Sequence, residues 1–194
     1  MSERKKVALI IMDGWGHTTD TEHNAVHQAH TPFFDYALRT YPHTLLEASG
    51  LAVGLPKGQM GNSEIGHTTI GAGSSIDTDL VTIEKSIQDG SFFTNTAFMQ
   101  LVAHVKTYNS KIHMIGLLSD GGVHSHNTHV YAFLKFAHEQ GLRKDQVILH
   151  IFTDGRDTAP KTASKYMREL IVEMDKTVGV IGSFGGRYFG MDRA

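Results

Sequence analysis

The chain of 194 residues contains no cysteine, and what else it lacks narrows the classes of protein to which it can belong. Without cysteine it has neither disulfides nor thiolate metal sites, which fits a reducing compartment. Its 18 Lys and Arg against 20 Asp and Glu leave a net charge of -2, so no basic field indicates binding to nucleic acid or to an anionic membrane. No apolar run approaches the ~20 residues of a membrane span, and the run Val7–Met12 is shorter than the ~7–15 residues of a signal-peptide core. We therefore expect a cytoplasmic protein with no membrane or nucleic-acid partner.

Apolar runs of strand length alternate with segments of helical length in the second part of the chain. There we expect strands at 111–118, 146–152 and 178–184, and helices at 80–88, 95–108, 128–140 and 160–176. In the first part we expect strands at 7–12 and 44–48, and a helix at 32–40 with Thr31 as its cap and Pro32 at its first position. This alternation predicts an α/β fold around a parallel sheet. The change of pattern near Asp77 predicts a domain crossing.

Polar loops follow each of the last three predicted strands, with the sequences SDGGVHSH, TDGRD and GGRYFGMDR. Because parallel strands end at one edge of their sheet, we expect these loops to form one site. Its candidate residues are His124, Arg156, Asp157, Arg187 and Arg193. The planar fork of arginine matches carboxylate and phosphate oxygens, and Asp157 can accept hydrogen bonds from substrate hydroxyls. The set suits a small phosphorylated acid.

The alternative for each arginine is an ion pair with a nearby acid. Arg156 would then pair with Asp154 or Asp157, and Arg193 with Asp192. For any single arginine the ion pair is favoured, whereas three arginines on converging loops favour the substrate site.

Histidine is plentiful, at 13 residues, without forming a recognisable metal motif. The histidines of the loop 14–30 have no regular ligand spacing and are expected to be solvated. No carboxylate follows His124, His126 and His129 at a conventional spacing, so the indication of zinc is weak. One histidine that acts on substrate, with the others exposed, is the favoured interpretation.

The segment GQMGNSEIGH, residues 58–67, has Ser63 at its centre and glycines that let the backbone approach a ligand closely. Composition and spacing leave Ser63 open as either a helix cap or a nucleophile. The segment does not match the GxSxG elbow of hydrolases.

Asp13 follows the predicted strand 7–12 and either binds a ligand at the end of that strand or belongs to an Asp-Gly turn. We expect the strand to lie beside the loop of Ser63. A divalent metal that bridges Asp13 and Ser63 would lower the pKa of the hydroxyl and polarise a phosphoryl oxygen. This arrangement favours phosphoryl transfer over acyl transfer.

Five motifs carry a resemblance to a known family: LIIMDGWG (9–16), GQMGNSEIGH (58–67), LLSDGGVHSH (117–126), HIFTDGRDTAP (150–160) and GGRYFGMDR (185–193). The chain resembles the cofactor-independent phosphoglycerate mutases of the alkaline phosphatase superfamily, which interconvert 3-phosphoglycerate and 2-phosphoglycerate in glycolysis and gluconeogenesis. The resemblance implies that Ser63 forms a phosphoserine intermediate and binds metal, and that Asp13 is a ligand of one of two manganese ions. It also implies that substrate is held by His124, Arg156, Asp157, Arg187 and Arg193.

Members of that family are more than twice as long, and their phosphatase domain is split by an inserted transferase domain. Residues 1–76 would then be the first segment of the phosphatase-like domain, and residues 77–194 most of the inserted α/β domain, truncated. The other metal ligands, two arginines and a lysine are expected on a complementary C-terminal half. The chain is therefore expected to be part of an active mutase; the alternatives are a non-catalytic fragment and a metal-dependent phosphatase. We expect the isolated chain to be inactive and limited proteolysis to cut first within 1–76, where sheet edges would be open.

Overall fold

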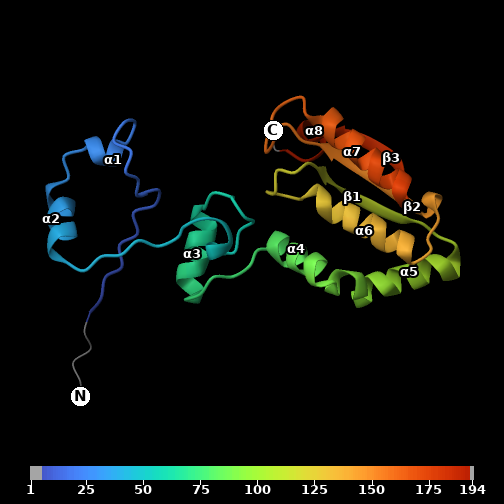
Figure 1. The fold of residues 1–194 in the computed structure, drawn as a ribbon, viewed down its shortest axis with the longest axis horizontal. Helices are drawn as coiled ribbons and strands as arrows, with labels where there is room; N and C mark the ends of the chain where they lie inside the picture. The colour runs from blue at the N-terminus through green and yellow to red at the C-terminus, as the bar shows by residue number, and fades with distance from the viewer. Residues whose placement is uncertain (1–5, 193–194) are drawn as a thin grey trace, which may run out of the picture.

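The computed structural model describes residues 6–192. The second part of the chain forms a parallel sheet with helices, and the first part is a long stretch of loops and short helices (Figure 1). The strands are β1 (Ile112–Leu118), β2 (Val147–Thr153) and β3 (Val180–Gly186). The α-helices are α1 (Ala25–Gln28), α2 (Pro32–Thr40), α3 (Ser63–Ala72), α4 (Asp79–Asp89), α5 (Thr96–Tyr108), α6 (Asn127–Glu139), α7 (Ala163–Lys176) and α8 (Arg187–Gly190). Short 3-10 helices are η1 (Gly50–Val53), η2 (Ser91–Thr94) and η3 (Lys144–Gln146).

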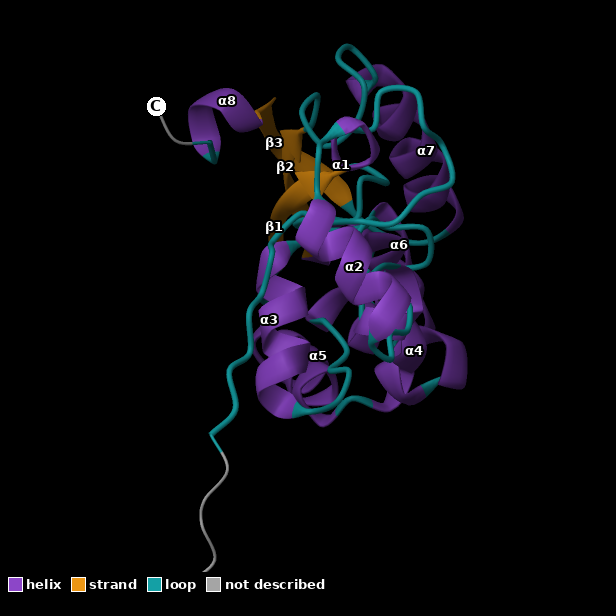
Figure 2. Cartoon of the chain, turned by 90° about the vertical axis from the view of Figure 1, so that its left-hand side faces the viewer, coloured by secondary structure: helices purple, strands orange, loops and turns teal. Residues whose placement is uncertain are grey.

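The sheet has the order β1-β2-β3, and both pairs of neighbouring strands are parallel. Leu118 is paired with Thr153, and Thr153 with Gly186, so all three strands end at the same edge. α6 connects β1 to β2, α7 connects β2 to β3, and both helices lie on one side of the sheet (Figure 2). The prediction of an α/β fold with a parallel sheet is confirmed.

The core lies between the sheet and these two helices. Alternate residues of β2, Val147 and Leu149, are buried together with Leu134 and Phe136 of α6 and Leu170 of α7. Burying an aliphatic or aromatic side chain of this size contributes about 1.5–3 kcal/mol each. This packing fixes the edge at which the strands end.

Local signals place the helices of this part of the chain to within a few residues. α5 is capped by the side chain of Asn95, which accepts hydrogen bonds from two backbone amides of the first turn. α6 ends just before Gly141, whose φ of 74° is left-handed. The helix expected from Pro160 begins instead at Ala163, because Lys161 has φ 68° and is outside the helical region.

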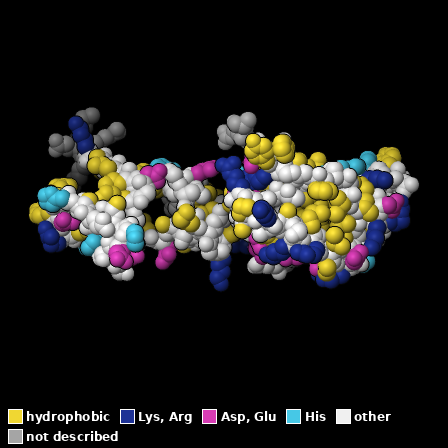
Figure 3. All heavy atoms as spheres, turned by 90° about the horizontal axis from the view of Figure 1, so that it is seen from above, with side chains coloured by type: hydrophobic (Ala, Val, Ile, Leu, Met, Phe, Trp, Pro, Cys, Tyr) yellow, Lys and Arg dark blue, Asp and Glu magenta, His cyan; other side chains and the backbone are white. Residues whose placement is uncertain are grey.

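Residues 6–78 are packed far less tightly. The buried residues among them are Gly50, Val53, Gly54 and Leu55. The predicted strands at 7–12 and 44–48 are wrong: both segments are loops, and Val7 is 91% exposed. A strand exists only when its backbone groups pair with a neighbour, and within residues 6–192 no strand lies alongside either segment. Hydrophobic side chains consequently appear on the surface of this part as well as the other (Figure 3).

α3 is not expected from the sequence, because its glycines and small residues give no clear apolar period. It begins at Ser63, is capped by the side chain of Asn62, whose oxygen accepts a hydrogen bond from the amide of Ile65 at 3.0 Å, and ends at Gly73 with φ 69°. Ser63 is therefore the first helical residue and not the cap. The interpretation of Ser63 as a helix cap is wrong, since that position belongs to Asn62.

α2 is confirmed with Pro32 at its first position, but Thr31 makes no capping hydrogen bond to the backbone. Its hydroxyl instead donates to the Asp35 side chain at 3.1 Å. The domain crossing near Asp77 stays a prediction, although α4 begins two residues later. Within residues 6–192, no helix has both the length and the apolar character needed to cross a bilayer.

Candidate functional site

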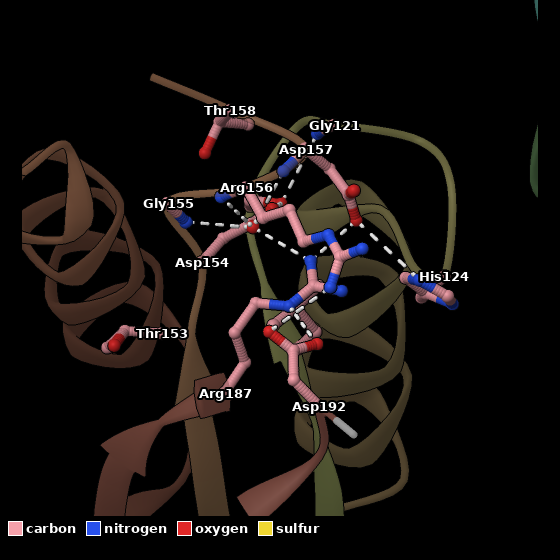
Figure 4. Close-up of polar contacts among 12 residues, drawn as sticks. Gly121, His124, Thr153, Asp154, Gly155, Arg156, Asp157, Thr158, Arg187 and Asp192 are labelled. Atoms are coloured by element: carbon pink, nitrogen blue, oxygen red, sulfur yellow. Dashed lines mark hydrogen bonds and ion pairs between the residues drawn. The ribbon is translucent and has the colours of Figure 1, made fainter. Parts of the chain in front are cut away.

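The loops that follow the three strands meet at one edge of the sheet, as Figure 4 shows. The loop after β1 carries His124, the loop after β2 carries Arg156 and Asp157, and Arg187 begins α8 directly after β3. The first two loops touch at Gly121, where a Cβ would lie 3.0 Å from the Cβ of Asp157. Only glycine leaves room for this close approach without a shift of the neighbouring chain.

Arg187 is the centre of the cluster. Its side chain is only 7% exposed and is surrounded by three carboxylates. Nη1 donates to Asp154 Oδ1 at 3.0 Å and to Asp157 Oδ2 at 2.7 Å, and Nε donates to Asp192 Oδ1 at 2.9 Å. The hydrogen bond to Asp157, followed by those to Asp192 and Asp154, raises the pKa of the guanidinium above its already high value, although burial opposes the shift. Arg187 is therefore a permanently charged anchor.

Asp154 organises the turn between β2 and the rest of its loop. Its side chain is 1% exposed. Oδ1 accepts hydrogen bonds from the backbone amides of Gly155, Arg156 and Asp157 at 2.8–3.1 Å, and Oδ2 accepts one from Ser119 Oγ at 2.6 Å. Burial alone would raise the pKa of this carboxyl, but the hydrogen bonds from Ser119 and the amides lower it well below its usual range. The ionised carboxylate thus holds the loops after β1 and β2 together.

Arg156 and His124 lie at the exposed side of the cluster. The Arg156 side chain is 70% exposed, and its Nη1 lies 3.8 Å from Asp192 Oδ2. His124 Nε2 lies 3.8 Å from Asp157 Oδ2. Both distances are long for direct hydrogen bonds, so these two side chains are held loosely.

The structure thus brings together His124, Arg156, Asp157 and Arg187, four of the five residues expected at this edge; Arg193 lies outside the described residues. Under the ion-pair alternative Arg156 was to pair with Asp154 or Asp157, and this choice of partner is wrong. Its side chain faces Asp192, because Arg187 already binds Asp154 and Asp157. Arginine–acid pairing, the alternative open from the sequence, is what the geometry shows for both arginines. Whether these residues also bind substrate stays a prediction.

Sequence reasoning gave no role to Ser119, and it considered Asp154 and Asp192 only as ion-pair partners. All three belong to the strand-end motifs, so their position in those motifs was the available signal. A second network at this edge joins Asp120 to the Tyr166 hydroxyl and to Lys165 Nζ. The hydrogen bond from Tyr166 is the largest cause of the lowered pKa of Asp120. Asp120 was not expected from the sequence.

Ser63 is exposed at the start of α3, where the first backbone amides of a helix favour negative charge. Its Oγ lies 3.2 Å from His67 Nδ1, but the same nitrogen lies 2.7 Å from the carbonyl oxygen of Ser63. Because a carbonyl only accepts, His67 Nδ1 carries the proton and donates to it. His67 in this position is therefore not a base for Ser63.

Asp13 lies in a turn, not at the end of a strand. Gly14 has φ 75° and the amide of Trp15 donates to the carbonyl of Met12 at 3.1 Å, so the Asp-Gly turn is the correct interpretation of the local structure. The segment 7–43 also lies apart from α3 (Figure 1), so the expected strand beside the Ser63 loop is wrong. Among the described residues, no group of three or more His, Cys, Asp or Glu is placed to hold a metal ion. Asp13 and Ser63 as arranged do not fit a two-metal centre.

The cluster at the strand ends is compact and carries one more carboxylate than guanidinium groups. Three carboxylates face two guanidinium groups. Asp192 is the one that contacts both arginines, with Nε of Arg187 and Nη1 of Arg156 directed at its two oxygens. A carboxylate or phosphate of a ligand could take the same position between the two arginines.

Comparison with known proteins gives consistent matches. A family model described as "BPG-independent PGAM N-terminus" matches residues 83–194. The chain is 51% identical over 192 residues to a 2,3-bisphosphoglycerate-independent phosphoglycerate mutase of Hydrogenovibrio crunogenus, covering 98% of this chain and 36% of that protein. It is 50% identical over 191 residues to the protein of the same name in Clostridioides difficile, covering 98% and 37%.

Among solved structures, the chain matches Leishmania mexicana phosphoglycerate mutase crystallised at low cobalt concentration. The TM-score is 0.71 at 36% identity, over 94% of this chain and 34% of that one. The chain thus spans about a third of the length of these relatives. With the family model covering more than half of its residues, the chain belongs to the BPG-independent phosphoglycerate mutase family and corresponds to the N-terminal part of its members.

Proposed function

We propose that this chain supplies the phosphoserine nucleophile and part of the substrate site of an enzyme that interconverts 3-phosphoglycerate and 2-phosphoglycerate. The observation that carries the proposal is the convergence of His124, Arg156, Asp157 and Arg187 at one edge of the sheet. Family membership gives the reaction, and the curated relatives bear the name of the mutase. Arg193 is included by its place in the motif.

A phosphoglycerate carries two anionic groups and a hydroxyl, and the cluster offers a partner for each. One anionic group would replace Asp192 between Arg156 and Arg187, since the 3.8 Å contact to Arg156 is weak and exposed. The hydroxyl would donate to Asp157, and His124 beside it would donate to a further oxygen. Arg187 keeps its position through Asp154 while the ligand exchanges with Asp192.

Ser63 would take the phosphoryl group. The bond between phosphorus and the glycerate oxygen breaks as the bond to Ser63 Oγ forms, and the hydroxyl proton ends on the released glycerate. Transfer back to the other glycerate hydroxyl gives the isomer. Ser63 is the first residue of α3. A phosphoserine there would be stabilised, because the backbone amides at a helix N-terminus favour its roughly two negative charges.

We expect two manganese ions in the complete centre, with Asp13 and Ser63 among the ligands. Because these residues alone do not fit that centre, the 194-residue chain alone is expected to have no mutase activity. Incubation of the chain with 3-phosphoglycerate and manganese, followed by an assay for 2-phosphoglycerate, tests this expectation. Turnover by the chain alone would contradict it, and release of free phosphate would indicate a phosphatase.

A chimera tests the proposed roles. Residues 1–194 replace the matching 36% of the Hydrogenovibrio crunogenus relative, to which they are 51% identical. We expect the chimera to form 2-phosphoglycerate, and Ser63→Ala to lower the rate by more than about a thousandfold, as loss of a nucleophile does.

Three further substitutions complete the test. Ser75→Ala changes an exposed serine outside α3 and should leave the rate unchanged. Arg156→Gln should raise KM more than about tenfold, whereas Arg143→Gln, an exposed arginine paired with Asp145, should not. A folded chimera without mutase activity, or one that retains it with Ser63→Ala, would contradict the proposal.

A further inference from the structure

A cavity of about 450 Å³ lies where α4 and the start of α6 face the loop around η1. This volume falls within the range of ~300–1,000 Å³ that is typical of small-molecule sites. Three elements of the chain line it: the η1 loop with Leu51, Pro56 and Lys57, α4 with Leu80, Glu84 and Lys85, and the start of α6 around His129. The cavity is therefore shared between residues 6–78 and the tightly packed part of the chain.

The wall formed by the η1 loop is held against α4 by close backbone contacts. The amide of Thr78 donates to the carbonyl of Gly54 at 2.8 Å. Gly54 has φ 80°, and a Cβ there would lie 1.9 Å from the carbonyl oxygen of Ile76, so glycine is required by both conformation and space. Lys85 of α4 forms an ion pair with Asp77. These contacts make the cavity a built feature of this junction.

The cavity is lined by one more cation than carboxylates, and one of its two cations, Lys85, is already paired with Asp77. Lys57 and Lys85 supply two cations, and Glu84 is the single carboxylate among the lining residues. Within residues 6–192 no carboxylate lies within 4 Å of Lys57 Nζ, whereas Glu84 lies 3.7 Å from His129. Burial and the neighbouring His126 lower the pKa of His129, although Glu84 opposes the shift, so at neutral pH this ring is an uncharged hydrogen-bonding group.

Four apolar side chains also line the cavity. Leu51 and Pro56 lie on one wall and Leu80 and Val81 on the other. A fully hydrated ion would gain nothing from these side chains, whereas a ligand with an apolar body would bury surface against them, which is worth about 25 cal/mol per Å². The lining thus matches a ligand that is charged at one end and apolar at the other.

We propose that this cavity binds a small organic anion with an apolar body, whose charged group is held by Lys57 and Lys85 and whose body packs on Leu51, Pro56 and Leu80. The site is separate from the strand-end cluster, because Arg156, Asp157 and Arg187 do not line it. The two share only the loop after β1. A bound ligand would bridge the η1 loop and α4 and so stabilise their contact.

Phenyl phosphate is a suitable probe, because it joins a phosphate to an apolar ring. The 15N-labelled 194-residue chain is titrated with it and followed by amide chemical shifts. We expect saturable shifts at residues 80–88 and 126–129, and weaker binding of both inorganic phosphate and phenol, each of which lacks half of the ligand.

Substitutions in the cavity then identify the charges. Lys57→Gln and Lys85→Gln should each weaken binding about fivefold, the loss expected for removing one charge ~4 Å from an anion in water. Lys106→Gln, an exposed lysine of α5 outside the cavity, should have no effect. Lys57→Gln is the cleaner test, because Lys85→Gln also releases Asp77.

Three outcomes would overturn the proposal: no saturable shift at residues 80–88, shifts confined to residues 154–157 and 187, or equal affinity in the lysine variants and the parent chain. The second outcome would place the anion in the strand-end cluster. It would support the proposed function and contradict the proposal of an anion site in the cavity. Loss of mutase activity in the chimera would not bear on the cavity.

Discussion

The two parts of the chain bury similar residues to very different extents. In residues 79–192, large apolar side chains such as Phe136 and Leu134 are completely buried. In residues 6–78, Ile10 is 82% exposed and Phe33 is 77% exposed. A packed core and a loose segment therefore do not differ here in composition. They differ in whether each side chain has partners to pack against.

The sheet shows why partners decide the outcome. β1, β2 and β3 each find a parallel neighbour within a few dozen residues, and α6 and α7 cover one face. The run 7–12 is as apolar as β2, yet nothing within residues 6–192 pairs with it. The relatives of this chain are about three times as long as the chain itself. A parallel strand pairs with a segment that is distant in the sequence.

Limited proteolysis should show the largest difference between the two parts. Cleavage follows the free energy of local opening, which is near zero for exposed loops and close to the full free energy of unfolding for a packed core. We expect the first cuts within residues 6–78, at least about a hundredfold faster than any cut between 112 and 186, as measured by mass spectrometry of timed digests. Uniform resistance of the chain would show that the two parts are equally stable.

Matched phenylalanine substitutions test the same difference in energy. Phe136→Ala removes a fully buried ring and should lower the free energy of unfolding by about 3–5 kcal/mol. Phe33→Ala removes an exposed ring and should change it by less than about 0.5 kcal/mol. Urea denaturation followed by circular dichroism measures both, and equal losses would mean that residues 6–78 belong to the same cooperative unit.

How well the sequence predicts each part mostly follows the same division, and the exception is α2, which Pro32 at its first position marks locally. Helices and strands after residue 79 could be located because periodicity and capping residues are local signals and their partners are present. The strands at 7–12 and 44–48 could not, because the pairing they need is not local. The extent of α3 was not predicted, because Gly66 and the small residues around it give no apolar stripe.

The candidate site divides in a similar way. Convergence of the loops that carry His124, Arg156 and Arg187 follows from parallel topology, so the sequence was sufficient to predict it. Which acid pairs with which arginine depends on side-chain packing, and the choice of Asp192 for Arg156 could not be obtained from spacing. The predicted position of Asp13 at the end of a strand was wrong, because residues 7–12 do not form that strand.

Asp154 makes the stability of the packed part depend on pH. Its pKa is lowered in the folded chain, so its stabilising effect is complete above the unfolded pKa of about 3.9 and is lost as the pH falls below that value. Asp154→Asn should cost about 1–3 kcal/mol at pH 7 and should flatten the decline in stability below pH 4. Thermal unfolding from pH 7 to pH 3 measures both effects.

Asp175→Asn is the matched control for this pH dependence. The Asp175 side chain is 73% exposed and, among residues 6–192, pairs only with Lys144 at 3.6 Å, so its loss should leave the pH profile parallel to that of the parent chain. A parent chain whose stability does not fall below pH 4 would contradict the role given to Asp154.

Two asparagine caps provide the smallest and most local comparison. Asn62 caps α3 and Asn95 caps α5, each through a side-chain oxygen that accepts from backbone amides at about the same distances. Replacing an Asn cap by Ala costs about 1 kcal/mol of helix stability. For Asn95→Ala that loss should appear in the free energy of global unfolding, because α5 packs into the core through Val102 and Val105. For Asn62→Ala global unfolding should not change, because α3 buries no side chain; the loss should appear instead as roughly fivefold faster hydrogen exchange in the first turns of α3. If Asn62→Ala lowered global stability as much as Asn95→Ala, α3 would have to unfold together with the sheet, and the division drawn between the two parts would move to the N-terminal side of Ser63.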